Sequence, residues 1–315
     1  MTKSSVVDLA GVGLNATDTI IPVPEYPARG SKVAFRSATV LPGGQVASAV
    51  AACAHWGLRT RYVGKIGDDA AGRLHREEFA RLGVDAHLVT ARGCPSQQAF
   101  ILVDDKGERT VLWKRDARLT LRPEELRREW VENARVLHVD GHDTVAAATA
   151  AGWAREAGVP VVADLDELYP GVEELLPKLD YFVASRDIPG RLVGERDLRK
   201  ALPEVHKRYG YVLTAATLGE EGVLAWDGTN FAHAAAYRVH VLDSIGAGDI
   251  FHAGFIYGLL QKWPLQRQLD FACAAAALNC RGVGARGGIQ PVERIEELMA
   301  TGERYGSQSN LSLRC

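Results

Sequence analysis

The chain has 315 residues, of which 47% are hydrophobic and 24% are charged, and its formal net charge at pH 7 is −2. These values are typical of a globular protein with one large α/β domain, or a core with a smaller appendage, and they argue against intrinsic disorder. A chain without a strong positive charge has no general attraction to nucleic acid or to an anionic membrane, so we expect neither as a partner.

The amino-terminal residues and the cysteines bear on location. The stretch MTKSSVVDLAGVG has one lysine and then a short run that contains Asp8, which fits neither a signal peptide nor a membrane span. The five cysteines form no C-x-x-C pair, and an odd number is awkward for a disulfide framework. We therefore expect a reduced, cytoplasmic protein.

The first part of the chain mixes strand and helix patterns. After a strand over 6–13, the segments 16–24 and 31–42 are β-rich, and a helix over 43–57, a strand over 60–67 and a helix over 69–83 follow. Alternating residues predict two further strands over 96–105 and 108–116, joined by the turn DDKGE into a hairpin.

From residue 122 onwards helices and buried strands alternate. Helices are predicted over 123–132 and 144–158, strands over 135–141, 159–166, 180–185 and 211–217, and two helical stretches between 246 and 282. Apolar strands separated by helices predict an α/β fold, a doubly wound and mostly parallel sheet with helices on both faces.

Two strand-rich segments interrupt this core. We expect residues 14–41 and 96–118 to meet as a small β lid, and residues 1–13, 42–95 and 119–315 to form the core that binds nucleotide and substrate. The lid would lie over the carboxyl edge of the sheet, where ligands of open α/β folds bind.

The first glycine motif, GVGLNA at 11–16, matches a dinucleotide-binding fingerprint only in its letters. That fingerprint needs a helix directly after the glycines, whereas here TDTIIPVPEYP is β-branched and broken by prolines. An acidic residue at the distance expected for ribose binding is also missing. The sequence therefore argues against a nicotinamide dinucleotide site.

The motif DSIGAGDIFHAG at 243–254 carries the chemistry. Gly246 and Gly248 free the backbone to form a nest of N–H groups, and the helix that follows directs its positive dipole end into that nest. An N-cap by Asp243 or Ser244 would explain the acids alone, but a cap does not require two glycines at this spacing. Asp249 within an anion site is reasonable if it accepts a proton from the group that attacks a phosphate, which predicts phosphoryl transfer.

Two other glycine turns are less specific. Gly43 and Gly44 precede a helix where the lid joins the core, so they are either a simple strand-to-helix turn or a hinge that lets a ligand approach the backbone. TLGEEG at 217–222 is either a hairpin turn or a loop that lies along a nucleotide.

DSIGAGDIFHAG resembles the carboxyl-terminal signature of the ribokinase-like, or pfkB, carbohydrate kinases, D-T-x-G-A-G-D-x-F-x-x-G. The stretch from Gly43 to Gly72, with its double glycine and its GKIGDDAAG ending, is similar to the amino-terminal signature of the same family. The resemblance extends over nearly the whole chain and implies a Rossmann-like core with a sugar-covering β lid. RTVLWKRD and VLHVDGHD are most similar to the ketohexokinase and sulfofructose kinase branch.

The resemblance also implies roles for individual residues. Asp249 would be the catalytic base, and the backbone of Gly246, Ala247 and Gly248 the anion hole. Sugar contacts would come from Asp18, Gly43, Gly44, Gln45 and Asp249, and nucleotide contacts from Thr217, Gly219, Gly222, Gly246, Gly248 and Asn279, the last beside adenine. Asp243, with the segment GVGARGG, would lie near a loop that binds a monovalent cation such as K⁺.

The sequence departs from the family pattern at several positions. Gln45 stands where the family usually has asparagine, and the N-x-x-E segment linked to magnesium is absent, which leaves Asp187 as the nearest acidic equivalent. Lys32 and Arg36 share one face of a predicted lid strand, and with Arg115 they either meet an anionic group of the substrate or belong to a solvated outer face.

We therefore expect an ATP-dependent kinase that transfers the γ-phosphoryl group of Mg-ATP to the primary hydroxyl of a small sugar, a ketohexose in the first instance. A nucleoside kinase with an aromatic pocket in the lid, and a sugar sensor without catalysis, are the alternatives. Lid strands with free edges often pair, so we expect a homodimer formed through the lid.

Overall fold

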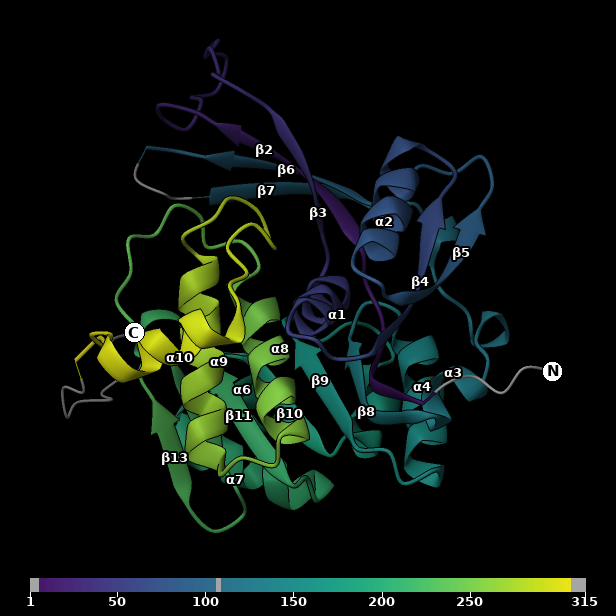
Figure 1. The fold of residues 1–315 in the computed structure, drawn as a ribbon, viewed down its shortest axis with the longest axis vertical. Coiled ribbons are helices and arrows are strands. Elements are labelled where there is room, and N and C mark those ends of the chain that lie inside the picture. Colours follow the sequence, from purple (N-terminus) through teal and green to yellow (C-terminus); the bar gives the residue numbers. More distant parts are fainter. Residues whose placement is uncertain (1–5, 106–108, 307–315) are drawn as a thin grey trace.

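The computed structural model describes residues 6–105 and 109–306, and Figure 1 shows a large sheet with a smaller one above it. The large sheet has nine strands in the order β13-β12-β11-β10-β9-β8-β1-β4-β5. Neighbours are parallel from β11 to β5, while β12 and β13 are antiparallel additions at one edge. The strands are β1 Val7–Val12, β4 Thr60–Gly67, β5 Asp85–Ala91, β8 Ala134–Asp140, β9 Val161–Leu165, β10 Tyr181–Ser185, β11 Leu213–Thr217, β12 Val223–Trp226 and β13 Phe231–Ala234.

Helices cover both faces of this sheet because successive residues of its strands point to opposite sides. Leu9, Val162 and Val183 join one apolar cluster with α1, α8 and α9, whereas Ala10 and Phe182 join the cluster with α4 and α7. The helices are α1 Gln45–His55, α2 Ala70–Arg81, α3 Glu129–Glu132, α4 Thr144–Glu156, α5 Val172–Leu175, α6 Ile188–Val193, α7 Leu198–Tyr209, α8 Ala247–Leu260, α9 Leu265–Asn279 and α10 Val292–Thr301. The expected doubly wound α/β fold is confirmed.

The second sheet, called the lid sheet below, has four strands in the order β3-β2-β6-β7. They are β2 Ala16–Pro22, β3 Thr39–Gly43, β6 Gln98–Val103 and β7 Arg109–Lys114. Strands β2 and β6 are parallel and come from separate parts of the chain, and β3 and β7 flank them in antiparallel orientation. In Figure 1 the lid sheet projects above the core.

One face of the lid sheet packs on the core. Ile20, Ala99 and Ile101 form an apolar cluster with Ile245 and Ala285, which belong to the two loops that flank α8 and α9. The lid strands therefore lie directly against the segment that contains the motif DSIGAGDIFHAG.

Two predicted elements are wrong in detail. Residues 31–38 have no regular structure, and the strand begins only at Thr39, so the shared strand face of Lys32 and Arg36 does not exist. The predicted helix over 123–132 is a short 3₁₀ turn at Pro123–Glu125 followed by α3, because Leu126 adopts an extended conformation between them. The DDKGE turn includes residues 106–108, which lie outside the described residues.

Candidate active site

The candidate site lies where the strand order of the large sheet reverses, between β1 and β8. The chain leaves β1 at Gly13, and the Leu14 N–H donates to the carboxylate of Asp140 at the end of β8 over 2.6 Å. Parallel α/β sheets bind ligands at such a reversal because the connections on its two sides leave in opposite directions. Gly13 is required here, since a Cβ at this position would lie 2.4 Å from the Asp140 carboxylate.

The turn before α8 is built around Gly246. Its φ of 74° is left-handed, and a Cβ there would lie 2.4 Å from the carbonyl oxygen of Ala285, so a side chain is excluded on both counts. The turn brings the first residues of α8, Ala247 to Asp249, to the helix N-terminus, where N–H groups lack carbonyl partners within the helix. The Ala247 N–H contacts the Ser244 carbonyl at 3.3 Å, so Gly248 and Asp249 supply the more available donors.

Gly248 differs from Gly246 in its surroundings. It is exposed, and a Cβ at this position would meet no atom within 4 Å. Packing therefore does not require glycine here. Because a Cβ on a helix tilts toward the helix N-terminus, a side chain at Gly248 would point toward the space in front of the first turn, where an anion would bind.

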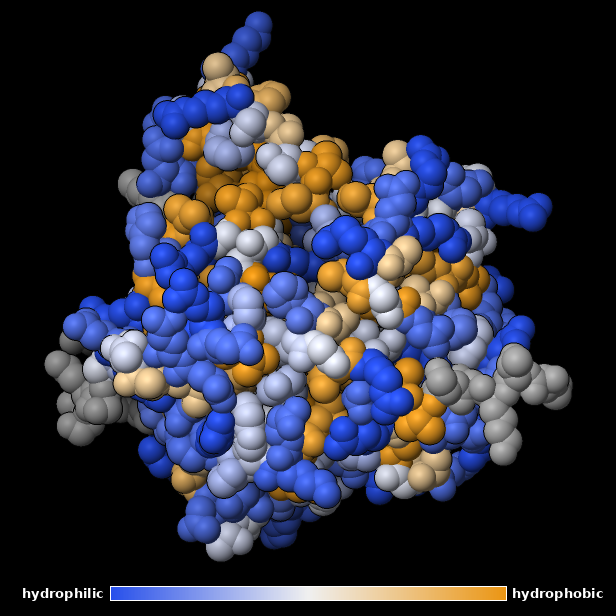
Figure 2. Space-filling model, in the orientation of Figure 1, coloured by the Kyte–Doolittle hydropathy of each residue, from blue (hydrophilic) through white to orange (hydrophobic). Residues whose placement is uncertain are grey.

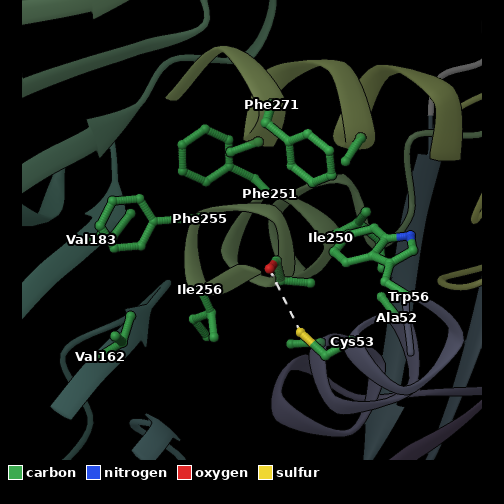
Figure 3. Close-up of a cluster of buried hydrophobic side chains, with 14 of the residues drawn as sticks. Ala52, Cys53, Trp56, Val162, Val183, Ile250, Phe251, Phe255, Ile256 and Phe271 are labelled. Carbon is green, nitrogen blue, oxygen red and sulfur yellow. Dashed lines mark hydrogen bonds between the residues drawn. The ribbon is translucent and has the colours of Figure 1, made fainter. Parts of the chain in front are cut away.

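Core packing fixes the helix that carries this turn (Figure 3). Ile250, Phe251 and Phe255 of α8 pack in the same cluster as Trp56, directly after α1, and Phe271 of α9. The Cys53 thiol donates to the Ala253 carbonyl at 3.6 Å, as the dashed line in Figure 3 marks.

Two glycines bring α9 close to α8. A Cβ at Gly254 would lie 2.7 Å from the Cα of Ala272, and one at Gly258 would lie 3.0 Å from the Gln268 side chain. This is the close approach of another element that glycines four residues apart permit. The first turn of α8 is thus held rigidly relative to the sheet.

Asp249 is half-buried in the first turn of α8. Removal from water raises its pKa to about 6, and the positive charge of Arg286 and a hydrogen bond from Ser48 oppose that rise. The carboxylates of Asp166 and Asp140 raise the pKa further. A carboxylate with a pKa just below neutrality is poised to accept a proton at physiological pH.

Asp18 lies on β2 and faces the same cleft. Burial raises its pKa to about 6, the charge of Asp249 adds to the rise, and Arg286 opposes it. Gly43 packs against this carboxylate, since a Cβ there would lie 2.2 Å from the Asp18 Oδ2. The structure thus brings together Asp18, Gly43 and Asp249, which are far apart in the sequence.

Gly44 and Gln45 complete this side of the cleft. Gly44 has a φ of 96°, and a Cβ there would lie 2.5 Å from the Cα of Asn15, so it is required by the turn into α1. The side chain of Gln45 opposes the rise in the pKa of Asp166, which directly follows β9, and its buried amide oxygen has no partner among the described residues. A buried acceptor without a partner is one that a substrate hydroxyl can satisfy.

Arg286 is a site residue that sequence reasoning did not single out. Its guanidinium is 6% exposed and contacts three separate elements. It donates to the Gly43 carbonyl at 2.9 Å and the Ser48 hydroxyl at 3.2 Å, and it pairs with the Glu78 carboxylate of α2.

The expected nucleotide loop follows β11, at the same edge of the sheet. Thr217 ends that strand beside Ser185 of β10, and Gly219 and Gly222 have φ angles of 64° and 85° in the turn to β12. A Cβ at Gly222 would collide with the Ala234 carbonyl, while one at Gly219 would meet no atom within 4 Å. Gly219 is therefore the position in this turn where a ligand has room to approach.

Asn279 ends α9, between the loops on either side of the anion turn. Its side chain is fully buried, donating to the carbonyls of Ile245 and Ala285 and accepting from the Gly288 N–H. Its position beside adenine stays a prediction. The residue ties together the loops on either side of the anion turn.

Asp243 has a related role. Its carboxylate accepts from the N–H groups of Ile245 and Gly284, at 2.9 and 2.8 Å, and so joins the same two loops. The segment GVGARGG thus lies beside the DSIGAG turn, as the resemblance implied.

Asp187 is exposed, lies at the N-terminus of α6 and pairs with Arg191 at 3.3 Å. Over residues 6–105 and 109–306, no three acidic, histidine or cysteine side chains converge as a metal site would require. In the same residues, no helix combines the length and the apolar character needed to cross a membrane.

Three cationic residues were considered for an anionic group of the substrate: one is paired with a carboxylate, and the other two lie in an irregular segment. Arg115 makes a two-pronged contact with the nearly buried Asp143, at 2.7 and 2.8 Å. Lys32 and Arg36 are exposed in the irregular segment between β2 and β3.

Comparisons with known proteins show what the whole chain is similar to. A family model described as pfkB family carbohydrate kinase matches residues 1–291. An ATP-dependent ribose-1-phosphate kinase of Halopiger xanaduensis is 30% identical over 274 residues, 85% of this chain and 90% of the relative. A fructoselysine 6-kinase of Escherichia coli is 29% identical over 250 residues, 76% of this chain and 90% of the relative.

The fold is shared with a solved ribokinase. The structure of the Arabidopsis thaliana enzyme complexed with ribose and ATP superposes with a TM-score of 0.79 and 22% identity, covering 94% of this chain and 99% of that one.

Proposed function

The chain belongs to the pfkB family of carbohydrate kinases, phosphotransferases with an alcohol group as acceptor, and we propose how its site performs the transfer. In this proposal Asp249 is the general base, the backbone N–H groups at the start of α8 form the anion hole, and the acceptor is the primary hydroxyl of a neutral sugar.

One observation carries the mechanism: a carboxylate with a pKa of about 6 stands in the first turn of a helix whose N-terminus opens onto free space at Gly248. The sugar hydroxyl would give its proton to Asp249 as its oxygen attacks the γ-phosphorus, the bond from that phosphorus to the β–γ bridging oxygen would break, and ADP would leave. The N–H groups and the helix dipole would stabilise the charge on the transferred phosphoryl group. Asp18, across the cleft, would hold the sugar by accepting hydrogen bonds from its hydroxyls.

ATP would approach from the turn at 217–222, with Gly219 giving it room. Magnesium is usually held by substrate phosphates and one or two carboxylates, which suits a site with no preformed acidic cluster in the described residues. Exposed carboxylates at this edge, Asp166 and Asp187 among them, could reach the ion. The ion would neutralise charge on the phosphates. K⁺ would bind carbonyl oxygens of the loops that Asp243 joins.

The charge around the cleft supports a neutral acceptor, and among neutral sugars we propose a ketohexose. Asp18, Asp140, Asp166 and Asp249 give it a negative character, while Arg115 and Arg286 are neutralised by Asp143 and Glu78. The charge of Arg109 on β7 also reaches Asp18 and lowers its pKa, but the four carboxylates outnumber this cation, so a phosphate or sulfonate on the acceptor would still meet a net negative field. The named relatives act on different sugars, so the identity of the sugar comes from the site and the motifs alone.

One residue supports a nucleoside kinase as the second candidate. Trp113 of β7 is in register with Ala99, which is in register with Asp18, so these side chains share the substrate-facing side of the lid sheet. The indole is 63% exposed and could stack on a nucleobase.

The outer face of the lid sheet supports a homodimer. Val40, Phe100 and Leu112 are about half exposed and lie in one cross-strand row through Thr19. Figure 2 shows apolar surface on the lid at the top of the view. A second copy of the chain would cover these side chains.

The free thiols of the described cysteines fit the proposal of a cytoplasmic protein.

The test is a coupled assay of ADP release over ketoses, aldoses, sulfosugars and nucleosides, with Asp249→Asn as the matched variant. We expect turnover with a neutral sugar, and a loss of at least about a hundredfold in kcat in the variant with ATP binding retained. Near-normal turnover of Asp249→Asn would refute the role of Asp249 as the general base. A sugar sensor would show no transfer to any acceptor, and a preference for nucleosides would select the second candidate.

A further inference from the structure

Arg286 makes a connection that the family motifs do not describe. Its guanidinium is buried between the lid sheet, α1 and α2, and it lies 5.7 Å from the centre of the Phe79 ring. It binds the Gly43 carbonyl where the chain leaves the lid, and the Ser48 hydroxyl on α1. The planar guanidinium carries its N–H donors in a fork with fixed directions, so it can bind three acceptors at fixed angles. The compact ammonium group of a lysine cannot do this.

The hydrogen bonds at Ser48 run in one direction. Arg286 donates through Nε to the Ser48 oxygen at 3.2 Å, so the Ser48 hydroxyl hydrogen is free to point toward the Asp249 carboxylate, whose pKa Ser48 lowers. The same guanidinium thus holds Gly43, which packs on Asp18, and the serine that orients the base.

We propose that Arg286 is a positioning residue that links the lid hinge at Gly43 to the catalytic base Asp249 through Ser48. This inference rests on the proposed role of Asp249. Arg286 would keep the base oriented and ionised while the lid is closed over the sugar, and Glu78 would keep the guanidinium in place from its far side.

The electrostatics of Asp249 agree with this arrangement. The carboxylates of Asp140 and Asp166, at the ends of β8 and β9, raise its pKa, and it interacts with Asp18 and Asp164. Arg286 supplies the positive charge that counters them. Without that charge, the pKa of Asp249 would rise, and the base would lose its ionised form at a higher pH.

The experiment compares Arg286→Ala and Arg286→Lys with the unchanged protein. Carbon-13 NMR of aspartate-labelled protein gives the pKa of Asp249 directly, its signal being the one lost in Asp249→Asn. We expect the pKa to rise by about one unit in Arg286→Ala, and the acid limb of kcat/KM to move to higher pH by the same amount. In Arg286→Lys, the charge remains but the fork is lost, so we expect an unchanged pKa and kcat reduced about tenfold.

A matched control and a chemical rescue separate positioning from folding. Arg81→Ala removes an exposed arginine from the groove that Leu41, Leu74 and Glu78 also line, and should leave kcat and the acid limb unchanged. Because Arg286 lines this groove too, millimolar guanidinium can enter it and should restore part of the kcat of Arg286→Ala, whereas methylammonium should not.

Three outcomes would overturn the inference: an unchanged pKa of Asp249 in Arg286→Ala, a wild-type kcat in Arg286→Lys, or equal rescue by methylammonium. If Arg286→Ala does not fold, the kcat of Arg286→Lys decides. The NMR titration needs no turnover, so its result is separate from the test of Asp249 as the base. Full activity of Asp249→Asn would refute the proposed function even if the NMR titration came out as expected.

Discussion

The two glycines of the anion turn should respond in opposite ways to the same added methyl group. Gly246→Ala places a Cβ at a φ of 74° and 2.4 Å from the Ala285 carbonyl oxygen, so we expect a loss of at least about 2 kcal/mol in unfolding free energy. In Gly248→Ala the added Cβ meets no atom within 4 Å. Gly248 lies within α8, and in a helix alanine is favoured over glycine by up to about 1 kcal/mol. This variant should therefore be at least as stable as the unchanged protein.

Gly248→Ala, which should not reduce stability, should strongly reduce activity. The added methyl group would occupy the space in front of the N–H donors, so we expect kcat/KM to fall by at least about a hundredfold, the effect of losing one anion-hole donor. Urea denaturation measures stability and the coupled ADP assay measures activity for both variants. A Gly248→Ala protein with full stability and full activity would show that no phosphate binds at this turn, and the reasoning from the free space would fail.

Two further predictions concern pH and assembly. Because a general base must be ionised and the pKa of Asp249 is about 6, kcat/KM should fall about tenfold between pH 7 and pH 5, and a flat profile over this range would exclude Asp249 as the titrating base. Leu112→Lys places a charge on the outer face of the lid sheet, away from the cleft, so sedimentation should show monomers where the unchanged chain forms dimers. A chain that is monomeric before the change would contradict the proposed dimer.

Local patterns predicted the elements that local interactions determine. The alternation of apolar strands and helices predicts the doubly wound sheet, because each strand must bury both faces. The glycines of DSIGAGDIFHAG predict a turn at a helix start, and the structure has a left-handed Gly246 directly before α8. The prediction of one helix over 123–132 was wrong because the pattern of apolar residues does not show where the backbone becomes extended, here at Leu126.

Contacts between distant segments could not be read from the sequence in the same way. The resemblance implied roles near ligands for Asn279 and Asp243, and the sequence did not show that both side chains also hydrogen-bond backbone groups of neighbouring loops. Arg286 lies in the segment GVGARGG, which the resemblance linked to a cation loop without a role for the arginine itself, and its contacts with Gly43 and Ser48 join it to residues more than two hundred positions earlier. Only the fold shows which polar groups are satisfied internally and which are left for a substrate.

The parallel pairing of β2 with β6 bears on how the protein folds. Thr17 pairs with Gln98, so this contact closes a chain loop that contains α1, α2, β4 and β5. Closing so long a loop has an entropic cost that the compact core reduces only after β1, β4 and β5 have associated. The lid sheet should therefore acquire protection from hydrogen exchange late in refolding. A newly made chain would then form its nucleotide edge before Asp18 is in place to hold a sugar.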